Sequence, residues 1–101
     1  MRIVRIPDKV LVRFELFTGV RPPRTHMAVV SKLPVGNGAY IGTVVVDNPD
    51  DYGLIMHELV HAWQHDKIGW KFPFLYLAEL LAKGYKNSKY EVEARWYQSK
   101  F

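Results

Sequence analysis

The amino-acid sequence predicts an α+β fold, in which a small antiparallel sheet of three or four strands is followed by three helices. Residues 2–46 carry short alternating segments separated by glycine and proline, which is typical of strands. Residues 50–98 carry apolar residues at helical spacing, with glycines between the helical segments. Strands and helices in separate halves of a chain indicate an α+β fold. A length of 101 residues fits one domain, residues 1–101.

Strands are expected in the first half at residues 2–6, 9–17, 27–33 and 39–46. The first of these ends at the Pro-Asp pair at 7–8, which favours a turn. The second alternates, with apolar residues at 10, 12, 14 and 16 on one face. Residues 19–24 form a loop with two prolines. The Gly-Asn-Gly sequence at 36–38 predicts a hairpin between the last two strands.

Helices are expected in the second half at residues 50–66, at residues 73–83 and from about residue 88 toward the C-terminus. The run Asn48-Pro49-Asp50-Asp51 supplies a cap and acidic residues for the first helical turn. Gly69 interrupts the pattern and ends the first helix. Pro73 then suits the start of the second helix, and Gly84 suits the position just past its end.

The composition places the chain among globular proteins, because 49% of its residues are hydrophobic and 14% are aromatic. The sequence contains no cysteine, so any metal site must use histidine and carboxylate ligands. No secretory signal is visible at the N-terminus, and the longest nearly apolar run, residues 72–82, is too short to span a bilayer. We therefore expect a cytoplasmic protein, with export by a non-classical route left open.

The net charge of +4 raises the alternative of a basic nucleic-acid-binding module. The fourteen lysines and arginines are spread along the chain, and the Arg-Pro-Pro-Arg sequence at 21–24 is the one local basic feature. No basic stripe is interleaved with aromatic residues. A solvated basic surface explains this charge more simply, and the sequence gives no indication of oligomeric state.

The stretch LIMHELVHAWQHD, residues 54–66, contains an H-E-x-x-H motif formed by His57, Glu58 and His61. At 100° per residue these three lie on one arc of a helix together with Gln64 and His65. Two imidazoles one turn apart can converge on zinc at about 2.0–2.1 Å. Glu58 beside them would accept a proton from a water held by the metal. The alternative is that this arc simply faces solvent. The opposite arc is apolar and comprises Ile55, Met56, Leu59, Val60, Ala62 and Trp63.

A catalytic zinc site needs a third protein ligand and an open position for water. The pattern H-E-x-x-H-x-x-G-x-x-H does not supply it, because Gln64 and Lys67 stand at its glycine and final histidine positions. On a straight helix His65 would lie about 12 Å from His57 along the axis. We therefore expect His65 at the surface or behind the ligands.

A carboxylate on the last helix is the remaining source of a third ligand, and two residues there qualify, Glu91 and Glu93. They are about 200° apart around a helix, so both cannot face one ion. Glu91 also fits a capping box with Ser88, in which its carboxylate would serve only the helix. Residue patterns alone leave this choice open.

The sequence HELVHAWQ, followed downstream by YEVEA, resembles the small gluzincin metallopeptidases, H-E-x-x-H enzymes whose third ligand is a glutamate on a later helix. The likeness covers residues 47–98 and is closest to the minimal versions called minigluzincins. It implies a zincin-like fold, a Zn²⁺ cofactor held by His57, His61 and Glu91, and peptide hydrolysis with Glu58 as general base. Arg95 stands where the family often has an aspartate that supports a histidine ligand. The resemblance also implies a peptide substrate bound as an extended strand, along residues 39–46 by position.

The resemblance also implies a rival to an active enzyme. Minimal members of the family include latent forms in which a C-terminal segment blocks the cleft, and residues 97–101 here are partly aromatic. A zinc-binding fold without peptidase activity is therefore an alternative.

Further polar residues are candidates for supporting roles. Tyr85, Tyr90 and Tyr97 are candidate donors to an oxyanion, with core packing as the simpler interpretation. Asp47, Asp50 and Asp66 are candidate partners of the histidines, although capping explains Asp50 better. Glu79 is expected at the solvent edge of a core helix.

Overall fold

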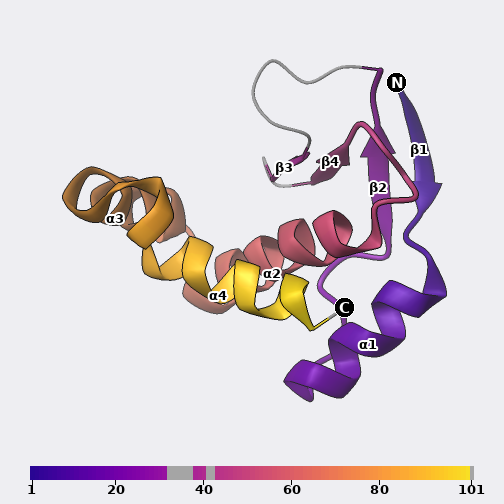
Figure 1. The fold of residues 1–101 in the computed structure, drawn as a ribbon, viewed down its shortest axis with the longest axis horizontal. Coiled ribbons are helices and arrows are strands. Elements are labelled where there is room, and N and C mark those ends of the chain that lie inside the picture. The colour runs from indigo at the N-terminus through magenta and orange to yellow at the C-terminus, as the bar shows by residue number, and fades with distance from the viewer. Residues whose placement is uncertain (32–37, 41–42, 101) are drawn as a thin grey trace.

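The computed structural model describes residues 1–31, 38–40 and 43–100, in which four strands and four helices follow one another along the chain (Figure 1). The α+β class predicted from the sequence is confirmed. The described part contains one more helix than the three expected. The elements are β1 (Arg2–Arg5), α1 (Asp8–Thr18), β2 (His26–Val29), β3 (Gly38–Tyr40), β4 (Val44–Val46), α2 (Tyr52–Ile68), α3 (Phe72–Asn87) and α4 (Lys89–Ser99).

The sheet has the order β1-β2-β4-β3 and is mixed, so the expectation of a wholly antiparallel sheet is wrong. β1 and β2 are antiparallel, as are β3 and β4, but the central pair β2 and β4 is parallel, with Ala28 opposite Val45. The predicted hairpin between residues 27–33 and 39–46 is also wrong, because β4 lies between β2 and β3. Its turn at 36–37 lies outside the described residues. The strand expected at 39–46 is two strands, β3 and β4.

The segment predicted as a strand at residues 9–17 is helix α1, which is the main error of the sequence analysis. The buried residues are Val10, Leu11 and Phe14, a helical spacing, whereas Val12 and Leu16 are exposed. Asp8 in the first turn and Gly19 just past the end are helix signals that the alternation concealed. Gly19 takes a left-handed φ of 72°, and its N–H bonds Glu15 O at 2.8 Å.

Helix α2 is the centre of the molecule, because it contacts β3, β4, α1, α3 and α4. The apolar arc expected on it is buried, apart from Trp63, which is half-buried. The core between α2, α1, the sheet and α4 is made of Ile6, Val10, Leu11, Phe14, Met27, Val29, Val44, Val46, Ile55, Met56, Leu59, Val60 and Ala94. Asp51 caps α2 by accepting from Leu54 N at 3.1 Å, so the cap is Asp51 rather than Asp50.

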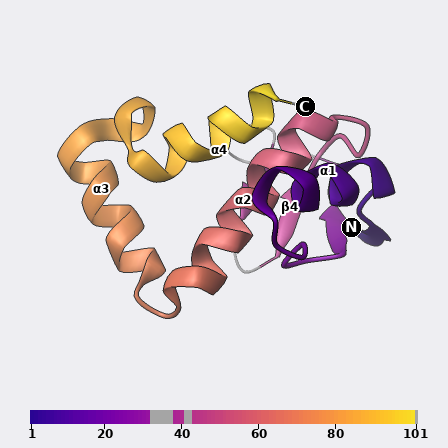
Figure 2. The ribbon, with the colours of Figure 1, turned by 90° about the horizontal axis from the view of Figure 1, so that it is seen from below.

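Helix α4 runs back along α2, and α3 lies at the edge of the molecule and connects the two helices (Figures 1 and 2). α3 has Pro73 near its start and kinks at Gly84, where φ is 78° and ψ is 168°. Glu79 lies close to the next helix, because its Oε1 accepts from the backbone N–H of Lys89 at 3.0 Å and so caps α4. In the described part of the chain, none of the helices has both the length and the apolar character needed to cross a membrane.

Candidate metal and catalytic site

The polar arc of α2 is buried, which excludes the alternative that it faces solvent. His57, Glu58 and His61 are only 6%, 4% and 5% exposed. α3 and α4 cover this arc, since both helices pack against α2. Ionisable groups are buried at a high cost unless they are paired or bind a metal. The periodicity of α2 could not predict this burial, because the helices that cover the arc, α3 and α4, come later in the chain.

Three potential ligand atoms converge between α2 and α4. Oε1 of Glu91 lies 2.9 Å from Nε2 of His57 and 3.0 Å from Nε2 of His61. Glu91 is 2% exposed, although it belongs to a helix of which only Tyr90, Glu91 and Ala94 are buried. Tertiary packing therefore directs this carboxylate at the histidine pair.

The capping-box alternative for Glu91 is wrong. Ser88 is the N-cap of α4, but its side chain makes no capping hydrogen bond. Its buried Oγ has no hydrogen-bond partner among the described residues. The carboxylate of Glu91 is directed at the histidines instead, and Glu79 from α3 satisfies the first N–H of the helix.

A buried group formed by His57, Glu58 and His61 could hold a metal ion, because their candidate ligand atoms all lie within 4.8 Å of one another. Glu91 adds a carboxylate oxygen to the two imidazole nitrogens, a donor set that suits zinc. Ligand atoms about 2.0–2.1 Å from a tetrahedral ion lie about 3.3 Å apart. The observed separations of 2.9 and 3.0 Å are a few tenths shorter. The site therefore fits a zinc ion after a slight expansion.

Each histidine is oriented by a glutamine on the side of the ring away from Glu91. Nδ1 of His57 lies 2.8 Å from Oε1 of Gln98, and Nδ1 of His61 lies 2.7 Å from Oε1 of Gln64. An amide oxygen can only accept, so Nδ1 carries the proton in both rings. This leaves Nε2 of each neutral ring as the atom available to a metal.

Glu93 takes part in the site indirectly. Its Oε1 accepts from Nε2 of Gln64 at 2.9 Å, and the same amide also donates to Tyr90 O at 2.9 Å. Gln64 is 1% exposed, so both bonds form in a buried setting. The two glutamates that the sequence could not separate thus have different contacts: Glu91 reaches both histidines, and Glu93 reaches the amide that orients His61.

The carboxylate of Glu58 is buried beside the two histidines. Burial raises its pKa, an effect that the positive charges of His61 and His57 oppose and that Glu91 reinforces. A raised pKa suits a group that must both accept and release a proton near neutral pH. This is the role that the sequence pattern predicted for Glu58.

The contact between Glu91 and His61 shifts the pKa of both groups. Burial alone would raise the pKa of Glu91, but the hydrogen bonds from His57 and His61 hold it well below its usual range. Burial alone would lower the pKa of His61, but the hydrogen bond with Glu91 raises it above its usual value. Without a metal, protonated His61 can therefore donate from both ring nitrogens, to Gln64 and to Glu91.

Tyr76 on α3 completes the contacts of Glu91, because its hydroxyl donates to Oε2. Its ring lies edge-on to His61, with centroids 5.9 Å apart, and stacks on Tyr90. Burial and the bond to Glu91 raise the pKa of Tyr76, so the hydroxyl stays protonated. Phe72 packs beside both tyrosines. This aromatic cover lowers the local dielectric and strengthens the charge interactions beneath it.

Two residues that contact this cluster were not predicted from the sequence: Tyr76, which contacts Glu91, and Gln98, which contacts His57. Tyr76 is the one residue with a polar group between Phe72 and Ala78, a run in which a hydroxyl is a weak signal for a polar neighbour. Gln98 lies seven residues after Glu91, which is two helical turns and hence the same face of α4. That spacing could have identified Gln98, whereas the signal at Tyr76 is too weak to assign it a partner.

The three tyrosines proposed from the sequence differ in position. Tyr90 is buried and packs against Phe72, and Tyr97 packs against Trp63, so both have packing roles. Tyr85 follows the kink in α3 and is 58% exposed. Burial and the negative charges of Glu91 and Glu58 raise the pKa of the Tyr85 hydroxyl.

The remaining candidates lie outside the convergent ligand group. His65 is half-buried and stacks on Phe72, with centroids 5.5 Å apart. Asp66 forms a two-point ion pair with Arg24, at 3.0 and 3.2 Å, so the pair fixes the Arg-Pro-Pro-Arg loop to α2. Asp50 is exposed. In the C-terminal segment that would block the cleft in the latent alternative, residues 97–99 continue α4, and Phe101 lies outside the described residues.

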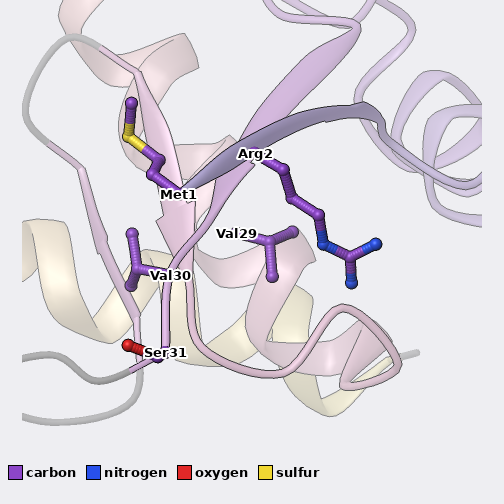
Figure 3. Close-up of a pocket in the computed structure, with 5 residues that line it drawn as sticks. All are labelled: Met1, Arg2, Val29, Val30 and Ser31. Atoms are coloured by element: carbon purple, nitrogen blue, oxygen red, sulfur yellow. The ribbon is translucent and has the colours of Figure 1, made fainter.

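An open pocket of about 340 Å³ lies at the far end of the sheet, lined by Met1, Arg2, Val29, Val30 and Ser31 (Figure 3). None of these residues belongs to the histidine group. The pocket therefore gives no support to a second reactive centre there.

Comparison with known proteins found no matching family model, no matching curated protein and no matching solved structure.

Proposed function

We propose that this chain is a zinc-dependent peptidase of the gluzincin type. The observation that carries the proposal is the convergence of Nε2 of His57, Nε2 of His61 and Oε1 of Glu91, with the carboxylate of Glu58 beside them. Two imidazoles and one carboxylate from two helices form the ligand set of a catalytic zinc site with one open position. A zincin-like architecture is part of this proposal.

In the proposed reaction His57, His61 and Glu91 hold the metal, and Gln98 and Gln64 keep the two rings in the tautomer that presents Nε2. When bound, zinc supplies a Lewis acid that polarises a carbonyl and makes water more acidic. Glu58 accepts a proton from water as the water oxygen adds to the peptide carbonyl carbon. It then delivers the proton to the leaving amine nitrogen as the carbon–nitrogen bond breaks.

Of the three tyrosines considered from the sequence, Tyr85 is the one we propose as the donor to the carbonyl oxygen as negative charge develops there. It is partly exposed, and its raised pKa keeps the hydroxyl protonated. Tyr90 and Tyr97 do not fit this role, because both are used in packing.

The substrate class proposed is an extended peptide. β3 is an edge strand of the sheet and contacts α2, which carries the catalytic residues. β4 is paired on both sides, so its backbone has no free edge. Among the described residues of the range 39–46, β3 therefore offers the free edge at which a peptide would add to the sheet, held by main-chain hydrogen bonds.

The test combines metal content with cleavage. We expect about one zinc per chain after purification without chelator, and cleavage of an unstructured protein such as casein. Glu58→Gln should keep the zinc and lose hydrolysis, because an amide has nearly the same shape but cannot accept the water proton. Absence of zinc, even after reconstitution, would overturn the proposal.

A latent or inactive zinc-binding fold gives a different result in the same experiment. It would bind zinc but leave casein intact, both as the full chain and after removal of residues 100–101. This deletion spares Gln98, so the histidine contact at 2.8 Å is retained. Cleavage that begins only after the deletion would identify the C-terminal end as the block.

A further inference from the structure

The outer face of α3 is apolar and exposed, in contrast to its inner face. At 100° per residue, Phe74, Leu77, Ala78 and Leu81 fall within an arc about 100° wide. All four are exposed, with Phe74 at 67% and Leu81 at 78%. The opposite arc faces the metal-ligand cluster and carries the polar groups, including Tyr76 and Glu79. An amphipathic helix normally has the reverse arrangement, so the outer face of α3 indicates a binding surface.

The position of α3 makes this face accessible to a large flat partner. Figure 2 shows α3 along one edge of the molecule, with α2 and α4 leading away from its two ends. In Figure 1 it lies at the end of the molecule farthest from β1 and β2. Trp70, just before the helix, is 73% exposed and contacts Phe74 edge-on, with centroids 6.3 Å apart. The apolar surface therefore extends beyond the start of the helix.

The charge around α3 is strongly one-sided. Residues 67–89 contain five lysines and one glutamate, a net charge of +4. The remaining residues contain nine basic and nine acidic side chains, which cancel, so the net charge of the whole chain resides in this segment. Glu79, its one acid, pairs with Lys83 at 3.0 Å on the inner side. An anionic partner therefore fits this surface. The five lysines are Lys67, Lys71, Lys83, Lys86 and Lys89.

We propose that α3 binds the surface of an anionic lipid bilayer, with its outer apolar face inserted among the acyl chains at the interface. Aromatic and leucine side chains on the buried side, with lysines at the margins, are the composition of interfacial helices. Lys71 illustrates the arrangement, because its Nζ lies 5.7 Å from the ring of Trp70, at the margin of the apolar face. A second copy of this chain fits less well, because it would bring two lysine-rich segments together.

The test is co-sedimentation with vesicles of phosphatidylcholine alone and of phosphatidylcholine with 30% phosphatidylglycerol. We expect binding to the anionic vesicles to be at least about tenfold tighter and to weaken in high salt. Phe74→Gln with Leu81→Gln should reduce binding by at least about tenfold, since two inserted apolar groups are lost. Lys71→Gln with Lys86→Gln should reduce only the preference for anionic vesicles.

The control uses a matched pair of exposed apolar residues on another helix. Val12 and Leu16 on α1 are 57% and 74% exposed. Val12→Gln with Leu16→Gln should leave vesicle binding unchanged. A blue shift of tryptophan fluorescence on binding should disappear in Trp70→Phe, which separates Trp70 from Trp63 and Trp96. Circular dichroism checks that each variant is folded.

Three results would overturn the proposal: no binding of the wild type to anionic vesicles, an equal loss in the α1 control, or self-association that the Phe74/Leu81 variant abolishes. The last result would identify a second copy as the partner. None of these measurements depends on zinc or hydrolysis, so this proposal and the proposed function can fail separately.

Discussion

Gln98 Oε1 lies 2.8 Å from Nδ1 of His57, across the contact between α4 and α2. Arg95, three residues earlier on α4, offers no acceptor for a histidine. Gln98, one turn further along α4, provides the acceptor instead. A neutral amide fixes the tautomer of His57 without adding a negative charge behind the ring.

Loss of this acceptor should weaken metal binding. Gln98→Leu is expected to reduce zinc affinity by about 10–100-fold, because His57 loses the group that holds its proton on Nδ1. Gln98→Glu retains an acceptor and should bind at least as tightly as the wild type. Competition against a chromophoric chelator measures both affinities. An unchanged affinity in Gln98→Leu would show that the amide has no part in orienting the ring.

The two glutamates of α4 should differ sharply in their effect on zinc. Glu91→Ala is expected to weaken zinc binding by several orders of magnitude, because a three-ligand site becomes a two-ligand site. Glu93→Ala removes only the acceptor of Gln64 and should cost about tenfold or less. The same chelator competition compares them. If Glu93→Ala had the larger effect, the ligand assignment would have to be reversed.

The stability of the metal-free protein should fall as the pH rises above about 6.5. The pKa of His61 is raised from 6.5, so its contribution is complete below that value and is lost as the pH rises through the folded-state pKa. The pKa of Glu58 is raised from 4.5, so its contribution is lost in the same direction, beginning already at the lower pH of 4.5. The pKa of Glu91 is lowered from 4.5, so its contribution is lost only in acid. Urea unfolding in the presence of a chelator measures this profile.

Zinc should reverse that alkaline trend. Protons compete with the metal for the histidine nitrogens, so zinc affinity increases as the pH rises through the folded-state pKa of His61. The increase in melting temperature on adding zinc should therefore be larger at pH 8 than at pH 5.5. Thermal unfolding at matched zinc concentration gives both values. A zinc effect that is constant over this range would mean that these histidines are not the ligands.

Because α1 is a helix, alanine substitutions at Leu11 and Leu16 should change the free energy of unfolding by different amounts. Leu11 is 7% exposed and Leu16 is 74% exposed. Leu11→Ala should therefore lower the free energy of unfolding by about 2–4 kcal/mol. Leu16→Ala should change it by no more than about 0.5 kcal/mol. Chemical denaturation measures both changes. A strand with residues 10, 12, 14 and 16 facing the core would bury Leu16 and expose Leu11, so Leu16→Ala would then have the larger effect.

The sequence by itself determined the local features of this protein. It predicted α2 to within two residues, because a cap, an apolar arc and a terminal glycine all act within one helix. It also placed His57, Glu58 and His61 on one face of α2, since helical spacing alone fixes that relation. Local signals failed at α1, where alternation and helical spacing coincide at residues 10 and 14.

Only the tertiary structure decided which groups meet. The choice between Glu91 and Glu93 depends on how α4 is rotated against α2, and packing of Tyr90 and Ala94 sets that rotation. The burial of the polar arc, the contact of Tyr76 with Glu91 and the parallel pairing of β2 with β4 likewise join residues far apart in the sequence. Such contacts form because they bury apolar surface and satisfy polar groups across the whole chain, and no single segment specifies them.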